Sequence, residues 1–190
     1  MVQIPTKRLT FEEYLTYNDG TENRYELFDG ELVLMTPTVG HTLIIKFLEK
    51  KFDAEIERLA FAWIALRDTG IRTGAKVSRV PDLSVFTTEQ ASLLINESAV
   101  FQTPPLLAVE VVSPESIKRD YRFKRSEYAA LRIPEYWIVD PLADKITVLL
   151  LVEGFYDANE FTGSEQIVSQ TFPELALTTE QVLQAGTIAL

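Results

Sequence analysis

The chain contains no cysteine and only one histidine in 190 residues. The lack of cysteine excludes a disulfide framework, a thiolate zinc site and a cysteine nucleophile. The single histidine excludes the common metal sites that are built from several imidazole groups. Any metal ion bound by this chain must therefore be held mainly by oxygen ligands.

Long apolar runs are also lacking. No segment approaches the roughly 20 consecutive apolar residues that a membrane-spanning helix requires. The first residues, Met1 to Pro5, lack the basic and apolar blocks of a signal peptide. We therefore expect no membrane partner and a cytoplasmic location.

Positive charge is scarce. The chain has 18 Lys and Arg residues against 28 Asp and Glu residues, which gives a formal net charge of -10. Proteins that bind nucleic acid use clustered Lys and Arg side chains to displace the counterions of the phosphates. A nucleic-acid-binding function therefore requires that the cations of this chain be concentrated locally.

The remaining composition is that of an ordinary globular protein. Apolar residues make up 46% of the chain and charged residues 24%, values that argue against extensive disorder. A chain of this length can bury a substantial core without disulfides or a structural metal. Because no linker, repeat or low-complexity segment divides it, we predict one domain that spans residues 1–190.

Several segments carry the signals of helices. Thr10 and Glu13 form a capping box, in which the hydroxyl and the carboxylate each accept a hydrogen bond from a free backbone N–H. Apolar residues in the second segment recur at spacings of three and four, as on one face of an amphipathic helix. The third segment ends before Pro134, which a helix does not readily continue through. The predicted helices cover residues 10–17, 41–60 and 116–132, with a short helix capped by residues 178–181.

Other segments have the signals of strands. Asp29-Gly30 tolerates the positive φ angles of a tight turn, so residues 24–35 are predicted to form a hairpin. The unbroken apolar run at 106–112 indicates a strand that is covered on both faces. Trp137 lies in another apolar strand, so we assign it to the core rather than to base stacking. The remaining predicted strands are residues 62–67, 76–86, 135–140 and 145–152, which together with the helices indicate an α/β fold.

Glu110 is the most informative single residue, because it is a carboxylate in the middle of an apolar strand. Burying an unpaired charge there would cost on the order of several kcal/mol, so something must compensate it. Asp82 follows Pro81 at the start of another apolar strand, and neighbouring strands lie about 4.8 Å apart. Both carboxylates can then bind one divalent cation. The alternatives are a structural ion pair with Lys or Arg for Glu110 and a turn position for Asp82.

The helix after Glu110 carries Asp120, Lys124 and either Glu127 or Tyr128 at steps of about one turn, which places them on one face. Lys124 can then reach back toward the acids. Alternatively, it is one more solvated charge in a cluster of cations, and that cluster could be the positive surface that a phosphate backbone needs. The other cations of the cluster are Lys118, Arg119, Arg122, Arg125 and Arg132.

A Pro-Asp on one strand, a Glu on the next and a nearby Lys form the arrangement used by the PD-(D/E)XK nuclease superfamily. Within it, the sequence resembles the Uma-type family of "putative restriction endonucleases", a domain of unknown function. The matching segments are Tyr25-Glu26-Leu27 with Asp29-Gly30-Glu31, His41, Val80-Pro81-Asp82, residues 109–114, Asp120 with Lys124 and Tyr128, and residues 135–141. The resemblance implies a restriction-endonuclease-like core, with a mixed central sheet flanked by helices, Mg²⁺ or Mn²⁺ as cofactor, and a homodimer.

The sequence departs from the superfamily pattern at Val112, where the superfamily has its lysine. Lys124 is the expected substitute, because it matches the Asp120-to-Lys124 spacing of the Uma-type pattern. The resemblance also marks Glu26, which either completes the metal site or is a polar residue opposite a hairpin turn. His41 either lies at the edge of the site or is a capping or surface residue.

The function that these residues predict is a metal-dependent endonuclease that hydrolyses phosphodiester bonds of nucleic acid, with DNA the expected substrate. Asp82 and Glu110 are the expected metal ligands, Lys124 orients the attacking water, and Glu26 assists. One alternative is a catalytically inactive module that keeps the fold and acts in protein interaction as a dimer. Another is a hydrolase that acts on a different phosphate ester or a nucleotide.

Overall fold

A computed structural model describes residues 8–188 of the chain. Its larger β-sheet has six strands in the order β11-β10-β9-β8-β6-β3. β8 and β9 run parallel and the other neighbouring pairs run antiparallel, so the sheet is mixed, as predicted. Helices cover it on both faces, which confirms the predicted fold class. The strands are β3 (Trp63–Leu66), β6 (Leu83–Thr87), β8 (Leu107–Val111), β9 (Glu135–Asp140), β10 (Lys145–Val152) and β11 (Phe155–Thr162).

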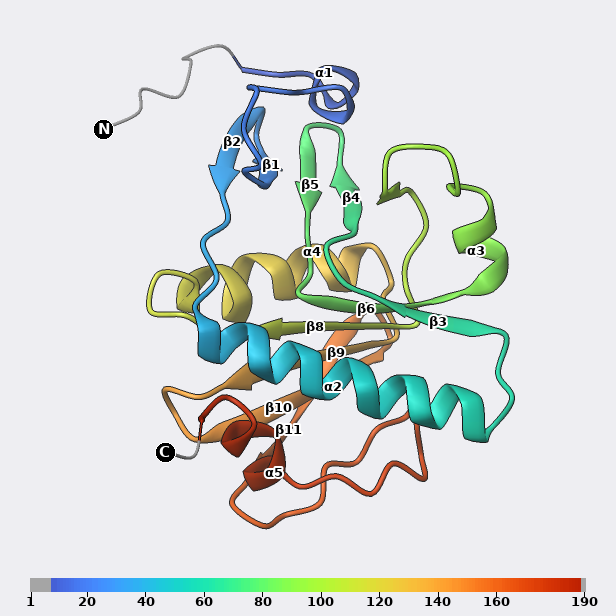
Figure 1. The fold of residues 1–190 in the computed structure, drawn as a ribbon, viewed down its shortest axis with the longest axis vertical. Helices are drawn as coiled ribbons and strands as arrows, with labels where there is room; N and C mark the ends of the chain where they lie inside the picture. Colours follow the sequence, from blue (N-terminus) through green and yellow to red (C-terminus); the bar gives the residue numbers. More distant parts are fainter. Residues whose placement is uncertain (1–7, 189–190) are drawn as a thin grey trace.

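The smaller sheet has five strands in the order β2-β1-β5-β4-β7 and lies at one end of the larger sheet (Figure 1). The predicted hairpin is confirmed, because β1 and β2 pair antiparallel around Asp29 and Gly30. Both turn residues have positive φ, 49° and 82°, as a tight two-residue hairpin turn demands. The strands are β1 (Tyr25–Phe28), β2 (Glu31–Leu34), β4 (Gly70–Gly74), β5 (Val77–Arg79) and β7 (Val100–Phe101).

The long helix α2 (Val39–Arg58) crosses one face of the larger sheet (Figure 1). Its buried face includes Leu48 and Phe52, and the Phe52 ring meets Trp137 of β9 edge-on at 5.6 Å. The short helix α5 (Thr179–Gln184) contributes Val182 to the same core. Trp137 is fully buried, so its assignment to packing is confirmed.

The opposite face of the larger sheet is covered by the segment that follows β8. It consists of a π-helical turn, η1 (Arg119–Lys124), which continues into α4 (Arg125–Ala130). Tyr128 of α4 packs there against Tyr136, with the rings edge-on at 5.0 Å. Because side chains alternate along a strand, Glu110 of β8 points toward this same face and away from α2.

The segment after β8 differs from the regular helix predicted for residues 116–132. It contains the wider π turn and its last helix ends at Ala130, and Arg132 then adopts a positive φ of 63° before Pro134. Single π turns inside helices are frequent at functional sites, because they change which side chains face inward. Here both Asp120 and Lys124 are buried.

The predicted strand at residues 76–86 is also corrected, because the structure divides it into β5 and β6, which belong to different sheets. The division falls at Pro81, which has no N–H to donate to a strand ladder. The strand β11 was not predicted. It is the edge strand of its sheet and, apart from Tyr156, its residues are exposed or half-buried, so it lacks the apolar pattern of a core strand.

The remaining helices are short. In α1 (Phe11–Leu15) the Thr10–Glu13 capping box is present, and α3 (Thr88–Ser92) has an equivalent box that was not predicted. The helix predicted at the end of the chain is confirmed as α5, capped by the Thr178 hydroxyl. Within residues 8–188, no helix is both long and apolar enough to cross a membrane.

Candidate active site

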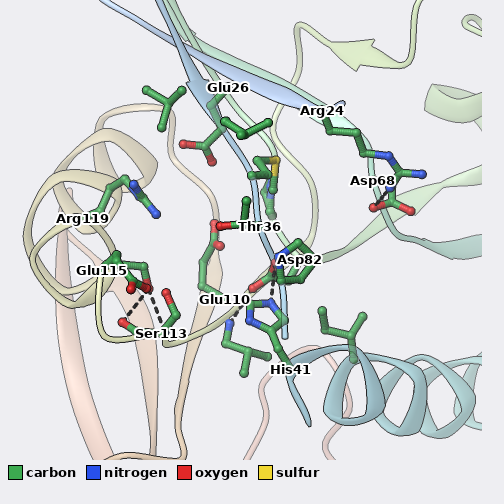
Figure 2. A pocket seen from close by; sticks show the side chains of 18 of the residues that line it. Arg24, Glu26, Thr36, His41, Asp68, Asp82, Glu110, Ser113, Glu115 and Arg119 are labelled. Atoms are coloured by element: carbon green, nitrogen blue, oxygen red, sulfur yellow. Dashed lines mark hydrogen bonds and ion pairs between the residues drawn. The ribbon is translucent and has the colours of Figure 1, made fainter. Parts of the chain in front are cut away.

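A cleft of about 540 Å³ lies where the two sheets meet the start of α2 and the segment after β8 (Figure 2). The structure brings all the residues singled out in the sequence to this cleft, although they come from five separate segments of the chain. Those residues are Glu26, His41, Asp82, Glu110, Asp120 and Lys124.

Asp82 and Glu110 lie next to each other where β6 begins and β8 ends, within the larger sheet. β6 and β8 pair antiparallel with Leu83 opposite Val109, and the same register continued by one residue puts Asp82 opposite Glu110. The backbone N–H of Val111 donates to Oδ2 of Asp82 at 2.7 Å, which fixes the aspartate against β8. The prediction that the two acids lie on neighbouring strands is therefore confirmed.

His41 completes the contacts of Asp82. Its Nε2 lies 2.9 Å from Oδ1 of Asp82, and both side chains are largely buried. The backbone N–H of His41 donates to the hydroxyl of Thr38, the N-cap residue of α2. His41 is thus placed at the edge of the cleft by the first turn of α2, with its side chain turned toward the carboxylate (Figure 2).

Lys124 reaches the acids from η1 and does not point to solvent. Its Nζ lies 2.8 Å from Oε2 of Glu110, 3.0 Å from Oε1 of Glu26 and 3.6 Å from Oδ1 of Asp120. The side chain is only 4% exposed. The cation that Val112 does not supply therefore comes from a different backbone position, as the spacing predicted.

Glu26 is held by a second cation that the sequence reasoning missed. The guanidinium of Arg79 donates to Oε2 of Glu26 at 3.2 Å, and the backbone N–H of Val80 donates to Oε1. Arg79 also donates twice to Glu127, at 2.6 and 2.7 Å. The only signal for it in the sequence is an arginine at the end of a short strand, directly before Val80-Pro81.

Burial raises the pKa of Glu110 well above its usual range, while Lys124 opposes this and the nearby carboxylates of Asp82, Asp120 and Glu26 add to it. The hydroxyl of Tyr128 donates to Oε1 of Glu110 at 2.7 Å. Any further positive charge placed beside Glu110 would therefore stabilise its ionised form.

The pKa of Glu26 is shifted in the opposite direction. Its burial would raise its pKa, but the charges of Lys124 and Arg79 outweigh the burial and hold the pKa below the usual value. Burial would likewise lower the pKa of Lys124, and here the carboxylates of Glu110, Glu26 and Asp120 prevail and raise it. Glu26 and Lys124 thus form a charged pair at neutral pH.

The two carboxylate oxygens of Asp120 have different surroundings. Its Oδ2 accepts a hydrogen bond from the Ser116 hydroxyl, whereas its buried Oδ1 has no hydrogen-bond donor and lies 3.6 Å from Lys124 Nζ. Burial raises the pKa of Asp120, and Lys124 and Ser116 oppose this rise. A buried carboxylate oxygen without a donor is costly unless a cation or a polar ligand comes close to it.

Cations also line the cleft at its rim. Arg24 is paired with Asp68, and Arg67 donates to Glu49. Arg119 enters from the opposite side of the cleft, and its Nε is buried without a hydrogen-bond partner (Figure 2). Arg119 is therefore placed to meet an anionic group that enters the cleft.

The carboxylates of the cleft form an incomplete set of ligands for a divalent cation. Among residues 8–188, no three His, Asp or Glu side chains converge as a ready set of metal ligands. Mg²⁺, however, keeps several waters and commonly takes one or two protein carboxylates together with substrate phosphates. Asp82 and Glu110 supply two adjacent carboxylates, and Asp120 adds a buried oxygen without a donor. The residues present therefore fit a hard cation that is completed by a phosphate.

Comparison with known proteins gives a family and a fold. Residues 11–180 match the Uma2 family, which is described as "Putative restriction endonuclease". The fold is similar to a crystal structure described as "a putative nuclease belonging to DUF820" from Anabaena variabilis, with a TM-score of 0.78 and 18% sequence identity. The alignment covers 94% of this chain and 99% of that one. No functionally curated protein matches the chain significantly.

Proposed function

Because the chain belongs to the Uma2 family of "putative restriction endonucleases", we propose that it is a divalent-metal-dependent nuclease that hydrolyses phosphodiester bonds of DNA. The observation that carries the proposal is the contact of Lys124 Nζ with Glu110 Oε2 at 2.8 Å, beside Asp82 on the neighbouring strand. Two carboxylates and a lysine at one cleft are the groups that metal-assisted hydrolysis of a phosphodiester requires.

Asp82 and Glu110 are the proposed ligands of Mg²⁺ or Mn²⁺, and the ion when bound would polarise the scissile phosphate and promote ionisation of the attacking water. Lys124 has a different role. Because its pKa is raised, it stays protonated at neutral pH and cannot accept a proton from that water. It instead donates hydrogen bonds that orient the water and stabilise the negative charge that develops on the phosphate.

Glu26 is proposed as a positioning residue. It contacts Lys124 at 3.0 Å and is itself fixed by Arg79 and by the backbone of Val80. Because Glu26 faces two cations, Lys124 and Arg79, its proposed assistance consists of holding the lysine. Preorganised charges of this kind accelerate hydrolysis because they need no rearrangement in the transition state.

The alternative is a catalytically inactive module that keeps the fold and binds a protein partner as a homodimer. The observation in its favour is that every oxygen of Asp82 and Glu110 already has a partner within the chain. The partners are His41, the backbone N–H of Val111, Tyr128 and Lys124. The net charge of -10 also opposes an extended contact with DNA. Sedimentation analysis tests whether the chain forms a homodimer. A homodimer is compatible with both functions.

The test of the proposal is cleavage of a panel of DNA, RNA and nucleotide substrates, with Mg²⁺ or Mn²⁺ and with EDTA. We expect cation-dependent cleavage by the wild type and its loss in Glu110→Ala and Lys124→Ala. The matched control is Lys50→Ala, which removes an exposed lysine of α2. Equal cleavage by the wild type and both site variants would contradict the assignment, and complete inactivity of the wild type on every substrate would favour the inactive module.

A further inference from the structure

Two aromatic side chains are exposed beside the cleft and touch each other. Phe28 at the end of β1 is 39% exposed and Phe123 of η1 is 38% exposed. Their ring centroids lie 6.2 Å apart with the planes inclined by 37°. Single exposed apolar residues are ordinary, but a contacting pair of aromatic rings from two separate elements forms a small apolar surface.

Neither ring lines the cleft, but each is close in the chain to a residue that does. Phe123 immediately precedes Lys124, whose side chain is buried in the cleft. Phe28 lies two residues after Glu26 on β1, so both side chains leave the same face of that strand, roughly 6.6 Å apart along it. Arg119 lies four residues before Phe123 on η1 and lines the cleft, so a strand held on the two rings would enter the cleft past Arg119.

Cations surround the same surface. Lys118 lies over the Phe123 ring, with Nζ 5.5 Å from its centroid, and the Arg79 guanidinium lies 4.7 Å from the centroid of the Phe28 ring. Arg122 is exposed on the same turn, and Arg119 lines the cleft itself. Five of the 18 Lys and Arg residues of the chain fall between residues 118 and 125. The positive charge that an acidic protein needs for binding a polyanion is therefore concentrated here.

One acid near this surface is paired within the chain and another is buried. Arg8 pairs with Asp29 at 2.8 Å and lies 3.6 Å from Glu31, at the turn that follows Phe28. Asp120, the only acid between residues 118 and 125, is buried toward the cleft. The exposed side of the turn thus presents aromatic rings and cations together.

We infer that Phe28 and Phe123, with Lys118, Arg119 and Arg122, form a platform that binds single-stranded nucleic acid and leads the strand into the cleft. Unpaired bases can stack on the exposed rings, whereas the bases of a duplex are already stacked on one another. The cations meet the phosphates of the strand. This inference rests on the proposed nuclease function, since it assigns that function a substrate class.

The test is binding rather than cleavage, measured by fluorescence anisotropy of a labelled DNA oligonucleotide in EDTA. A single strand, its RNA equivalent and the matched duplex are compared. We expect the wild type to bind the single strands more tightly than the duplex. In Phe28→Leu/Phe123→Leu, single-strand affinity should fall by at least about 5-fold per ring, the lower end of the range measured for base stacking. Leucine keeps an apolar cover over Arg79, and thermal unfolding checks the fold.

Salt dependence tests the cations separately. In Lys118→Ala/Arg122→Ala, the slope of log affinity against log salt should fall by about 1.4, because each phosphate contact to a single strand contributes about 0.7. The matched controls are Phe155→Leu, which removes a more exposed phenylalanine at the start of β11, and Lys50→Ala on α2. Both controls should bind as the wild type does.

Three results would overturn the platform: unchanged single-strand affinity in the double phenylalanine variant, tighter binding of the duplex, or a wild-type dimer that this variant dissociates. The last would assign the rings to an interface between copies of the chain. A wild type that binds single strands in EDTA but cleaves nothing with Mg²⁺ or Mn²⁺ would refute the nuclease function and leave the platform standing. A wild type that cleaves, with affinity unchanged in the phenylalanine variant, would refute only the platform.

Discussion

Lys124 Nζ lies 2.8 Å from Glu110 Oε2, although the lysine belongs to a helical turn and the glutamate to the buried strand before it. The pair occupies a cleft in which carboxylates outnumber cations. Electrostatic attraction therefore holds Lys124 beside the acids. Because Lys124 also lines the cleft, it is in a position from which a phosphate can be contacted.

Replacing Lys124 with methionine keeps the length of the side chain and removes its charge. We expect cleavage to fall by about 10²- to 10³-fold, as it does when one preorganised donor to a developing oxyanion is lost. The variant should also lose roughly 3–5 kcal/mol of unfolding free energy, because Glu110 and Glu26 lose a buried partner. Single-turnover cleavage and urea unfolding measure the two effects. Lys50→Met is the control, and cleavage equal to that of the wild type would contradict the role of Lys124.

Replacing Glu110 with glutamine should abolish cleavage and change how stability depends on pH. The pKa of Glu110 is raised in the folded protein. Wild-type stability is therefore reduced as pH rises above the unfolded value of about 4.3 toward the folded pKa. Glutamine avoids that cost but also removes the charge that faces Lys124, so the stability of the variant relative to the wild type should increase as pH rises through this range. Urea unfolding of both proteins across this pH range measures the change. A relative stability of the variant that decreases with rising pH would contradict a raised pKa of Glu110.

Glu26 should behave in the opposite way. Its folded pKa is lowered by Lys124 and Arg79, which outweigh its burial. The stability that it contributes is therefore complete above the unfolded value of about 4.3 and is lost as pH falls through the folded pKa. Glu26→Gln should be less stable than the wild type at neutral pH, and the difference should close in acid. Urea unfolding of both proteins over the same pH range is the measurement, and a constant difference at all pH values would refute the assignment.

Tyr128→Phe tests whether the Tyr128 hydroxyl lowers the pKa of Glu110. The hydroxyl of Tyr128 donates to Oε1 of Glu110 and favours the ionised carboxylate. Its removal should raise the pKa of Glu110 further and move the acid limb of the pH–rate profile to higher pH. Tyr156→Phe is the matched control, because the Tyr156 hydroxyl donates to the backbone of Ile133. An identical shift in both variants would show that the effect is a general response of the core.

Much of the candidate site could be predicted from sequence, because its signals are local. An isolated acid in an apolar strand indicated Glu110, and the helical spacing after it indicated that Asp120, Lys124 and Tyr128 share a face. The structure bears out this grouping, with all three side chains buried around Glu110. The spacing survives the change from a regular helix to a π turn because a step of four residues remains close to one turn in both.

Arg79 could not be predicted in the same way. It is set against Glu26 and Glu127 by the pairing of β5 with β1 and by the packing of α4, and these contacts join residues far apart in the sequence. The division at Pro81 was missed for a related reason. The apolar pattern continues across it, although a proline inside such a run is a signal against one continuous strand, and the structure places β5 and β6 in separate sheets. Edge strands such as β11 lack the pattern altogether, since burial does not constrain their outward-facing residues.

The measurement that tests the central claim most directly is calorimetric titration of Mn²⁺ into the wild type, Asp82→Ala and Glu110→Ala, with inorganic phosphate present. Glu22→Ala is the control, because Glu22 is an exposed acid that lines the same cleft. The account predicts saturable Mn²⁺ binding by the wild type and by Glu22→Ala, and no binding by either site variant. Absence of binding in the wild type, or equal binding in all four proteins, would contradict a metal site formed by Asp82 and Glu110.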